Sequence, residues 1–249
     1  MHDLNSLRSD LGRLGVAPGR AVVVHSSLRP VGAVDGGADT VIRALGESLG
    51  QTGTLLFPNL NIPHEFTAEN PPRFDLQKDP IRERLGVLPQ VFKHSYAREF
   101  SRHPTHAMMG VGPHCARLFA GHEESGLPCG PGTPWWRLGE IGGAILLLGV
   151  TQQSNTSIHG PEERHATYQL SAAPIDGVVI DAGREFRVSS RLHRWGNASD
   201  FSRINPWLEK AGGLLRGKVG DAECLLVDAR IFQTEVVARL RTDPRFLLR

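Results

Sequence analysis

Several features that define specialised proteins are scarce in this chain of 249 residues. Its three cysteines, Cys115, Cys129 and Cys224, are too few and too scattered for a disulfide framework or a paired-cysteine zinc site. The 28 basic and 26 acidic residues nearly cancel, and no run of like charges marks a nucleic-acid-binding tail. The longest apolar stretch, Ala144–Leu148 followed by Val150, is far shorter than the roughly 20 residues that cross a bilayer. We therefore expect a cytoplasmic protein with no nucleic-acid partner and no membrane partner.

The apolar segments that are present predict an α/β fold. Short β-branched or leucine-rich runs at Ala21–His25, Thr54–Phe57 and Ala144–Val150 are typical of buried strands, and an amphipathic helix is expected over Ala38–Leu49. Strands that alternate with helices predict a mixed central sheet flanked by helices, where ligands bind at the carboxyl ends of the strands. Further helices are expected over 116–120, 135–141, 200–210 and 231–241, a strand over 223–227, and a hairpin over 177–189.

A loop-rich insertion interrupts this pattern. Residues 59–85 carry four prolines and little periodicity, and a loop of this length in a compact domain is usually a lid or a binding loop. No repeat, low-complexity segment or clear boundary divides the chain. We therefore expect one domain over residues 1–249, with 59–85 as a long loop on the substrate side.

The segment from His25 to Gly37 leaves a predicted strand and enters a predicted helix. Its two hydroxyls, its guanidinium, its glycines and the following helix N-terminus all suit a phosphate group. It matches neither a Walker loop nor the GxGxxG pattern. On residue types alone, a phosphate-binding loop and a plain strand-to-helix connection are equally good interpretations.

A histidine and a carboxylate follow the third predicted strand. His159 and Glu162 are three residues apart, so they share one face of a helical turn. A carboxylate beside an imidazole fixes its tautomer and raises its basicity, as a general base requires. The competing interpretation is a helix N-terminus, with Thr156 or Ser157 as the cap and Glu162 accepting from free amides.

Other chemical motifs fail on their context. Ser48 lies in a GxSxG match, but it falls near the end of a predicted helix, whereas a nucleophile elbow follows a strand. The 11 histidines form no HExxH pattern, and Pro104 between His103 and His106 disfavours a helix presenting both to one ion. Cys129 lies in a Gly-Pro turn with no neighbour to activate it. We expect no metal.

Nine ordered segments together resemble the aminoglycoside 3-N-acetyltransferase family, whose fold differs from the common GNAT acetyltransferase fold. The likeness runs from about Leu4 to Leu248. The segments are 25–29 (HSSLR), 36–38 (GGA), 53–58 (GTLLFP), 101–104 (SRHP), 130–134 (GPGTP), 143–149 (GAILLLG), 155–159 (NTSIH) with Glu162, 199–201 (SDF) and 217–222 (GKVGDA).

The resemblance implies an enzyme that moves an acetyl group from acetyl-CoA directly to an amine, the 3-amino group of an aminoglycoside, without an enzyme nucleophile. His159 would take the proton, Glu162 would orient it, and Thr156 would occupy the family's threonine position. The resemblance leaves a homodimer open. The implied CoA-binding residues are His25, Ser26, Ser27, Leu28, Arg29, Gly32, Ser101 and His103.

The acceptor side is less well matched to the family. A polycationic substrate calls for acidic contacts, and the candidates are Glu65, Asp75, Glu163 and Asp200, although the chain itself is slightly basic. Phe100 precedes Ser101 where family members commonly carry arginine. Three alternatives therefore stay open: an acyltransferase for another amine, a hydrolase of the same fold, and a catalytically silent CoA-binding protein.

Overall fold

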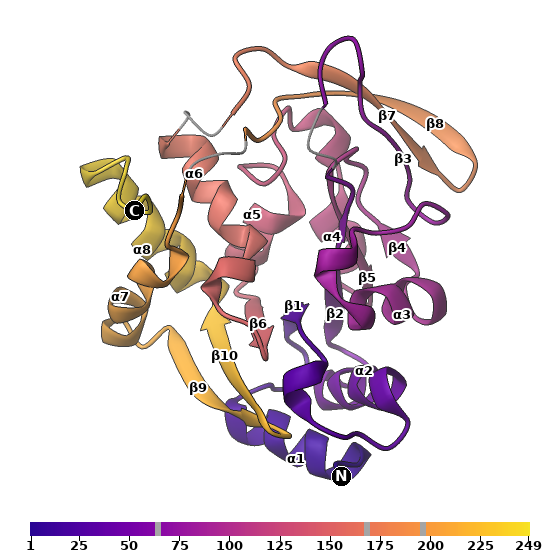
Figure 1. Ribbon diagram of the computed structural model, residues 1–249, viewed down its shortest axis with the longest axis vertical. Coiled ribbons are helices and arrows are strands. Elements are labelled where there is room, and N and C mark those ends of the chain that lie inside the picture. The colour runs from indigo at the N-terminus through magenta and orange to yellow at the C-terminus, as the bar shows by residue number, and fades with distance from the viewer. Residues whose placement is uncertain (63–65, 167–169, 195–197) are drawn as a thin grey trace.

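A seven-stranded mixed sheet forms the centre of the protein, as seen in a computed structural model that describes residues 1–62, 66–166, 170–194 and 198–249 (Figure 1). The strands lie in the order β4-β5-β2-β1-β6-β10-β9. They span Ala21–Ser26 (β1), Thr54–Leu60 (β2), Glu99–Phe100 (β4), His106–Val111 (β5), Ala144–Leu148 (β6), Leu214–Val219 (β9) and Ala222–Asp228 (β10).

The three central strands are parallel and the outer ones are antiparallel. β1 pairs in parallel with β2 and β6, so the carboxyl ends of all three strands meet at one edge of the sheet. β5 runs antiparallel to β2, with His106 opposite Leu60. The first residue of β5 therefore lies at the same edge as the last residue of β2, and this edge carries the site described below.

Helices cover both faces of the sheet. Alternate residues of β1 point to opposite sides: Val22 and Val24 join one apolar cluster, while Ala21 and Val23 join the other. This double burial explains why the central strands are continuous apolar runs in the sequence. The first cluster contains α1 (Leu4–Leu14), α2 (Gly37–Leu49) and α3 (Val87–Ser95), and the second contains α4 (Cys115–Phe119), α5 (Pro134–Glu140), α7 (Asn205–Lys210) and α8 (Ala229–Thr242).

A second, three-stranded sheet lies at the opposite end of the molecule from α1 (Figure 1). Its strands are β3 (Arg73–Asp75), β7 (Ile175–Asp181) and β8 (Arg184–Ser190), and Phe74 and Leu76 pack beneath it with Val179. β3 comes from the expected loop 59–85. Part of that segment is thus anchored in a sheet.

The predicted mixed α/β fold is confirmed, with boundaries shifted by a few residues. The exception is the helix expected over 200–210, which is a 3-10 turn, Phe201–Ile204, followed by α7. Pro206 explains the break, because proline is accepted only in a first helical turn. None of the helices in the described part of the chain is long and apolar enough to span a membrane.

Candidate active site

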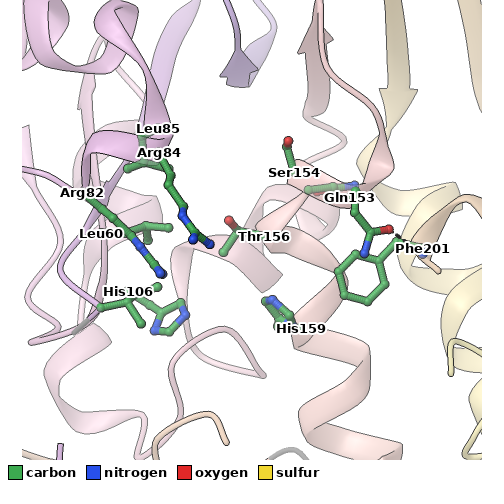
Figure 2. Close-up of a pocket in the computed structure, with 12 residues that line it drawn as sticks. Leu60, Arg82, Arg84, Leu85, His106, Gln153, Ser154, Thr156, His159 and Phe201 are labelled. Carbon is green, nitrogen blue, oxygen red and sulfur yellow. Dashed lines mark hydrogen bonds between the residues drawn. The ribbon is translucent and has the colours of Figure 1, made fainter. Parts of the chain in front are cut away.

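A pocket of about 350 Å³ opens at the carboxyl edge of the central sheet (Figure 2). Segments far apart in the sequence meet there: the end of β2, both ends of the 59–85 segment, the start of β5 and the residues around His159. The described lining residues are Leu60, Ile62, Arg82, Arg84, Leu85, His106, Gln153, Ser154, Asn155, Thr156, His159 and Phe201.

The histidine of the expected acid–histidine pair lies on the wall of this pocket. His159 begins α6 (His159–His165), and its Nδ1 lies 2.7 Å from Oε2 of Glu162 on the same helix. The Glu162 side chain is fully buried, whereas 17% of the His159 side chain remains exposed. The carboxylate holds the Nδ1 proton, so Nε2 is the nitrogen that can act on a substrate.

Local capping accounts for the position of His159. A 3-10 turn, Thr156–Ile158, leads directly into α6, and its cap is Asn155, whose side-chain oxygen accepts from the amide of Ser157. Glu162 bonds to His159 and not to a backbone amide. The structure thus favours the acid–base interpretation of the segment over the capping interpretation, and it places Thr156 in the pocket lining.

A second acid–histidine pair lies behind the first. Oε1 of Glu163 is 2.6 Å from Nε2 of His193, and the two imidazole rings, of His159 and His193, are 4.6 Å apart. Glu163 also accepts from the amides of Cys129 and Gly130. Burial raises the pKa of Glu163 to about 8, against the lowering effect of these amides, and burial lowers the pKa of His193 well below its usual value. Both shifts favour an uncharged pair that shares one proton.

The same residues form a three-donor cluster, since ligand atoms of Cys129, Glu163 and His193 lie within 4.8 Å of one another. Metal binding would require a thiolate, but burial and the adjacent Glu163 raise the pKa of the Cys129 thiol well above its usual value. Both oxygens of Glu163 already accept hydrogen bonds from backbone amides, those of Cys129 and Gly130. The chemistry of the cluster therefore favours an internal hydrogen-bonded network over a metal site.

The expected CoA loop lies next to the pocket. After β1, Ser26–Leu28 leads into a short 3-10 helix, Arg29–Val31. Gly86, which follows the pocket residue Leu85, lies beside the carbonyl oxygen of Ser26, and Gly32 lies beside the side chain of Asp221. Both glycines have a positive φ, 84° and 87°, which residues with a side chain rarely adopt. The glycines thus bring the 26–32 loop against its neighbours.

Three of the expected CoA contacts are buried in the protein interior. His25 is 3% exposed and its ring stacks on Trp135. Ser101 accepts from the amide of Met108 and bonds to His122, while Nδ1 of His103 accepts the amides of the following turn. Ser101 and His103 are both 0% exposed. Because the polar atoms of Ser101 and His103 are engaged within the protein, the structure does not present these two residues to a ligand.

The expected acidic contacts do not converge on the pocket. Asp75 accepts from the amides of Gln77 and Lys78, and Asp200 caps the 3-10 turn by accepting from Ser202. Glu163 is buried behind His159. None of these three carboxylates lines the pocket, because local backbone amides or His193 already engage them. Glu65 lies outside the described residues.

Sequence reasoning missed three charged or titratable residues that do line the pocket, Arg82, Arg84 and His106. Figure 2 shows Arg84 extending toward Thr156 and Arg82 ending above His106, with His159 also at the base of the pocket. The arginines lie within the 59–85 segment that was expected on the substrate side. The second histidine of the His-Pro-Thr-His run was the available clue to His106.

Comparison with known proteins agrees with the fold and the site. A family model described as aminoglycoside 3-N-acetyltransferase matches residues 23–241. The chain belongs to this family. The aminoglycoside N(3)-acetyltransferase III of Serratia marcescens is 30% identical over 259 residues, covering 96% of this chain and 85% of that protein. The resemblance stated from the sequence is thereby confirmed.

Solved structures of acetyltransferases share the architecture. A histidine-to-alanine variant of aminoglycoside acetyltransferase AAC(3)-IVa, in complex with a gentamicin, matches with a TM-score of 0.82 and 27% identity, covering 99% of this chain and 91% of that one. A complex of AAC-IIIb with CoASH matches with a TM-score of 0.80 and 26% identity, covering 97% of each chain. These structures of the family hold an aminoglycoside in one case and CoA in the other.

Proposed function

We propose that this protein transfers the acetyl group of acetyl-CoA directly to the 3-amino group of an aminoglycoside. The His159–Glu162 pair carries the proposal, because it places a histidine of fixed tautomer on the wall of a pocket at the carboxyl edge of the sheet. The names of its relatives supply the reaction class and the acceptor. Because all three cysteines are buried free thiols, we place the reaction in the reducing cytoplasm.

The reaction needs one proton acceptor from the enzyme and no covalent enzyme intermediate. The acceptor amine, once His159 has taken its proton, attacks the carbonyl carbon of the thioester and a C–N bond forms. The tetrahedral intermediate then collapses, the C–S bond breaks, and the remaining extra proton on the nitrogen passes to the departing thiolate, so that CoA is released as its thiol. Glu162 stabilises the imidazolium that forms on His159, since its buried carboxylate lies 2.7 Å from Nδ1.

The 26–29 loop is the proposed contact for the acetyl donor. It follows β1 at the same edge as the pocket and lies against Gly86, so a thioester at His159 could extend its pantetheine arm along it. Arg29 is exposed and can approach a phosphate of CoA. Leu28 and Ser27 would contact the arm itself.

Release of the CoA thiol from acetyl-CoA tests the proposed function. We expect release that depends on an added aminoglycoside such as gentamicin or sisomicin, with one acetyl group appearing on the aminoglycoside for each thiol released. Release into water without an amine would indicate a hydrolase. Binding of CoA without any thiol release would indicate a catalytically silent CoA-binding protein.

The pocket lining favours a second candidate acceptor, an amine that also carries an acid group. Among the described residues, the lining contains Arg82 and Arg84 and no Asp or Glu. Burial and the charge of Arg84 lower the pKa of Arg82, as expected for two guanidinium groups in one pocket. The guanidinium of Arg84 in this lining could bind a carboxylate or a phosphate.

A matched pair of amino sugars separates the two acceptors. We expect glucosamine 6-phosphate to be acetylated with at least tenfold higher kcat/KM than glucosamine if the second candidate holds. Arg84→Gln should remove that preference, and Arg187→Gln, an exposed arginine on β8, should leave it unchanged. A higher kcat/KM for gentamicin than for either sugar, rising further in Arg84→Gln, would reject the acid-bearing acceptor.

A further inference from the structure

One buried polar atom in the pocket has no role in the mechanism described so far. Nε2 of His106 is buried and has no hydrogen-bond partner, although His106 lines the same pocket as His159. The residue is only 2% exposed. An unsatisfied buried donor or acceptor is costly, so its retention in a pocket points to a ligand group that completes it.

The backbone fixes the position of His106. The residue is the first of β5 and lies opposite Leu60 of β2, and its carbonyl oxygen accepts from Nε1 of Trp135 at 2.8 Å. Its ring is nearly perpendicular to that of His159, with the centroids 6.5 Å apart. The two imidazoles are therefore held by different elements, a strand and a helix, on one pocket.

Hydrogen bonding around His103 decides which nitrogen of His106 carries the proton. Nδ1 of His103 accepts the amides of Thr105 and His106, so His103 carries its proton on Nε2 and donates it to Ser190. The hydroxyl of Thr105 lies 3.2 Å from that already occupied Nδ1 and 2.9 Å from Nδ1 of His106. We therefore assign Thr105 as the donor in its hydrogen bond with His106.

Because Nδ1 of His106 accepts this bond, the proton of its neutral ring is on Nε2, the nitrogen that has no partner within the protein. The ring stays neutral: burial and the neighbouring histidines, His193 first, lower the pKa of His106 well below its usual value. A neutral imidazole N–H can polarise a carbonyl, and it donates without placing a second positive charge beside the protonated base.

We propose that His106 donates a hydrogen bond from Nε2 to the carbonyl oxygen of the acetyl thioester. The inference rests on the proposed acetyl transfer and adds to it the group that stabilises the developing oxyanion. As the amine attacks, the carbonyl electron pair moves onto oxygen, where the N–H of His106 holds it. When the C–S bond breaks, that pair returns to carbon and the hydrogen bond weakens.

Two substitutions at His106 test this role. His106→Leu removes the donor, and we expect kcat for amine-dependent thiol release to fall about 100-fold or more while KM for acetyl-CoA changes less than threefold. His106→Gln returns an N–H at a similar reach, and we expect kcat within about tenfold of the wild type. Wild-type thiol release, measured first, reports the proposed function independently.

His122 supplies the matched control. It is also a buried neutral histidine, but both of its ring nitrogens are engaged, by Ser101 and by the carbonyl of Pro128, and it is not among the pocket-lining residues. We expect His122→Gln to lower Tm with little change in kcat. Equal losses of kcat in His106→Leu and His106→Gln, in proportion to their losses of Tm, would overturn the proposal.

A spectroscopic measurement keeps the test decisive if either variant folds poorly. Carbonyl-labelled acetyl-CoA is bound to the wild-type protein in the absence of an amine substrate, and the infrared stretch of its C=O group is measured. We expect this stretch at a lower frequency than in a solvent that donates no hydrogen bond, because a hydrogen bond weakens the C=O bond. The shift should be smaller in whichever His106 variant folds. A wild-type carbonyl stretch unchanged from that of acetyl-CoA in water-free solvent would contradict the proposal.

Discussion

Two consecutive glutamates on α6 each bind a histidine, yet their surroundings differ. Glu162 pairs with His159, part of which is exposed to the pocket. Glu163 pairs with His193, and that pair is at most 3% exposed. Successive side chains on a helix point about 100° apart, so one glutamate faces back along its own helix and the other faces the Cys129–Gly130 turn.

This difference in exposure shows that an acid–histidine pair is not in itself a catalytic feature. The two pairs have the same functional groups and nearly the same N–O distance, 2.7 Å in one and 2.6 Å in the other. Only the first pair has a ring on the pocket wall. The second pair ties α6 to the 129–130 turn, and we assign it to stability and to the support of His159.

Replacing His159 and replacing His193 should give the largest difference in kcat between the two acid–histidine pairs. His159→Ala removes the proposed proton acceptor, and we expect kcat to fall by about 1,000-fold with CoA affinity nearly unchanged. His193→Gln should lower kcat less than tenfold and lower Tm. Amine-dependent thiol release and calorimetric titration with CoA measure both effects. Unchanged turnover in His159→Ala would remove His159 from the mechanism.

Acidification should destabilise the protein mainly through its other buried histidines. Burial lowers the pKa of His25 and His122 to about 3, and it lowers that of His103 and His106 well below the usual value. Since the unfolded chain binds more protons, stability is full above pH 6.5 and is lost as the pH falls toward 3. Each neutral histidine adds a slope of about 1.4 kcal/mol per pH unit.

Between pH 4.5 and pH 6.5 the Glu163–His193 pair should add little to that slope. His193 releases a proton on folding in this range, whereas Glu163 takes one up, because its pKa is raised from 4.5 to about 8. The contribution of Glu163 is fully present below pH 4.5 and is lost progressively as the pH rises to 8. Urea unfolding at several pH values measures how the free energy of unfolding depends on pH.

The variant His122→Asn tests the contribution of one buried histidine. It should reduce the loss of unfolding free energy per pH unit below pH 6.5, and an unchanged dependence would show that His122 is protonated in the folded protein.

Replacing Glu163 should reduce stability more than replacing Glu162, whereas replacing Glu162 should reduce activity more than replacing Glu163. Glu163→Gln deprives the amides of Cys129 and Gly130 of one acceptor, so we expect a loss of about 1–3 kcal/mol in the free energy of unfolding. Glu162→Gln should cost less, because Oε1 of Glu162 has no hydrogen-bond partner to lose. Urea unfolding at neutral pH measures both. A larger loss in Glu162→Gln would reverse the assignment of the two pairs.

The smallest effect concerns a residue outside both pairs. Arg29→Ala should weaken CoA binding several-fold, and more at low salt, because it removes an exposed phosphate contact. Arg187→Ala serves as the control, since Arg187 lies on the second sheet. Calorimetric titration at two salt concentrations checks the prediction, and equal CoA affinity in Arg29→Ala and the wild type at both would count against the proposed loop contact.

Local patterns in the sequence predicted what depends on local geometry. The His159–Glu162 pair followed from a three-residue spacing on one helix, and the central strands followed from apolar runs buried on both faces. The Glu163–His193 bond joins residues 30 positions apart, which no spacing rule links. Arg84 shares a pocket with His159 only because the 59–85 segment returns to the sheet edge.

The strands that were missed have a physical explanation as well. β5 begins with histidine and contains a glycine and two methionines, which weakens the β-branched signal of a buried strand. β9 is an edge strand with exposed arginine and lysine, as edge strands commonly are. Tertiary pairing with β2 and β10 overrides these weak local preferences.

The most direct test compares kcat for amine-dependent thiol release in Glu162→Gln and Glu163→Gln under identical conditions. Both variants change one carboxylate to an amide at neighbouring positions of α6. The account predicts that Glu162→Gln loses about 100-fold or more, while Glu163→Gln stays within about tenfold of the wild type. Equal losses in the two variants, or the larger loss in Glu163→Gln, would contradict the claim that the His159–Glu162 pair alone performs the proton transfer.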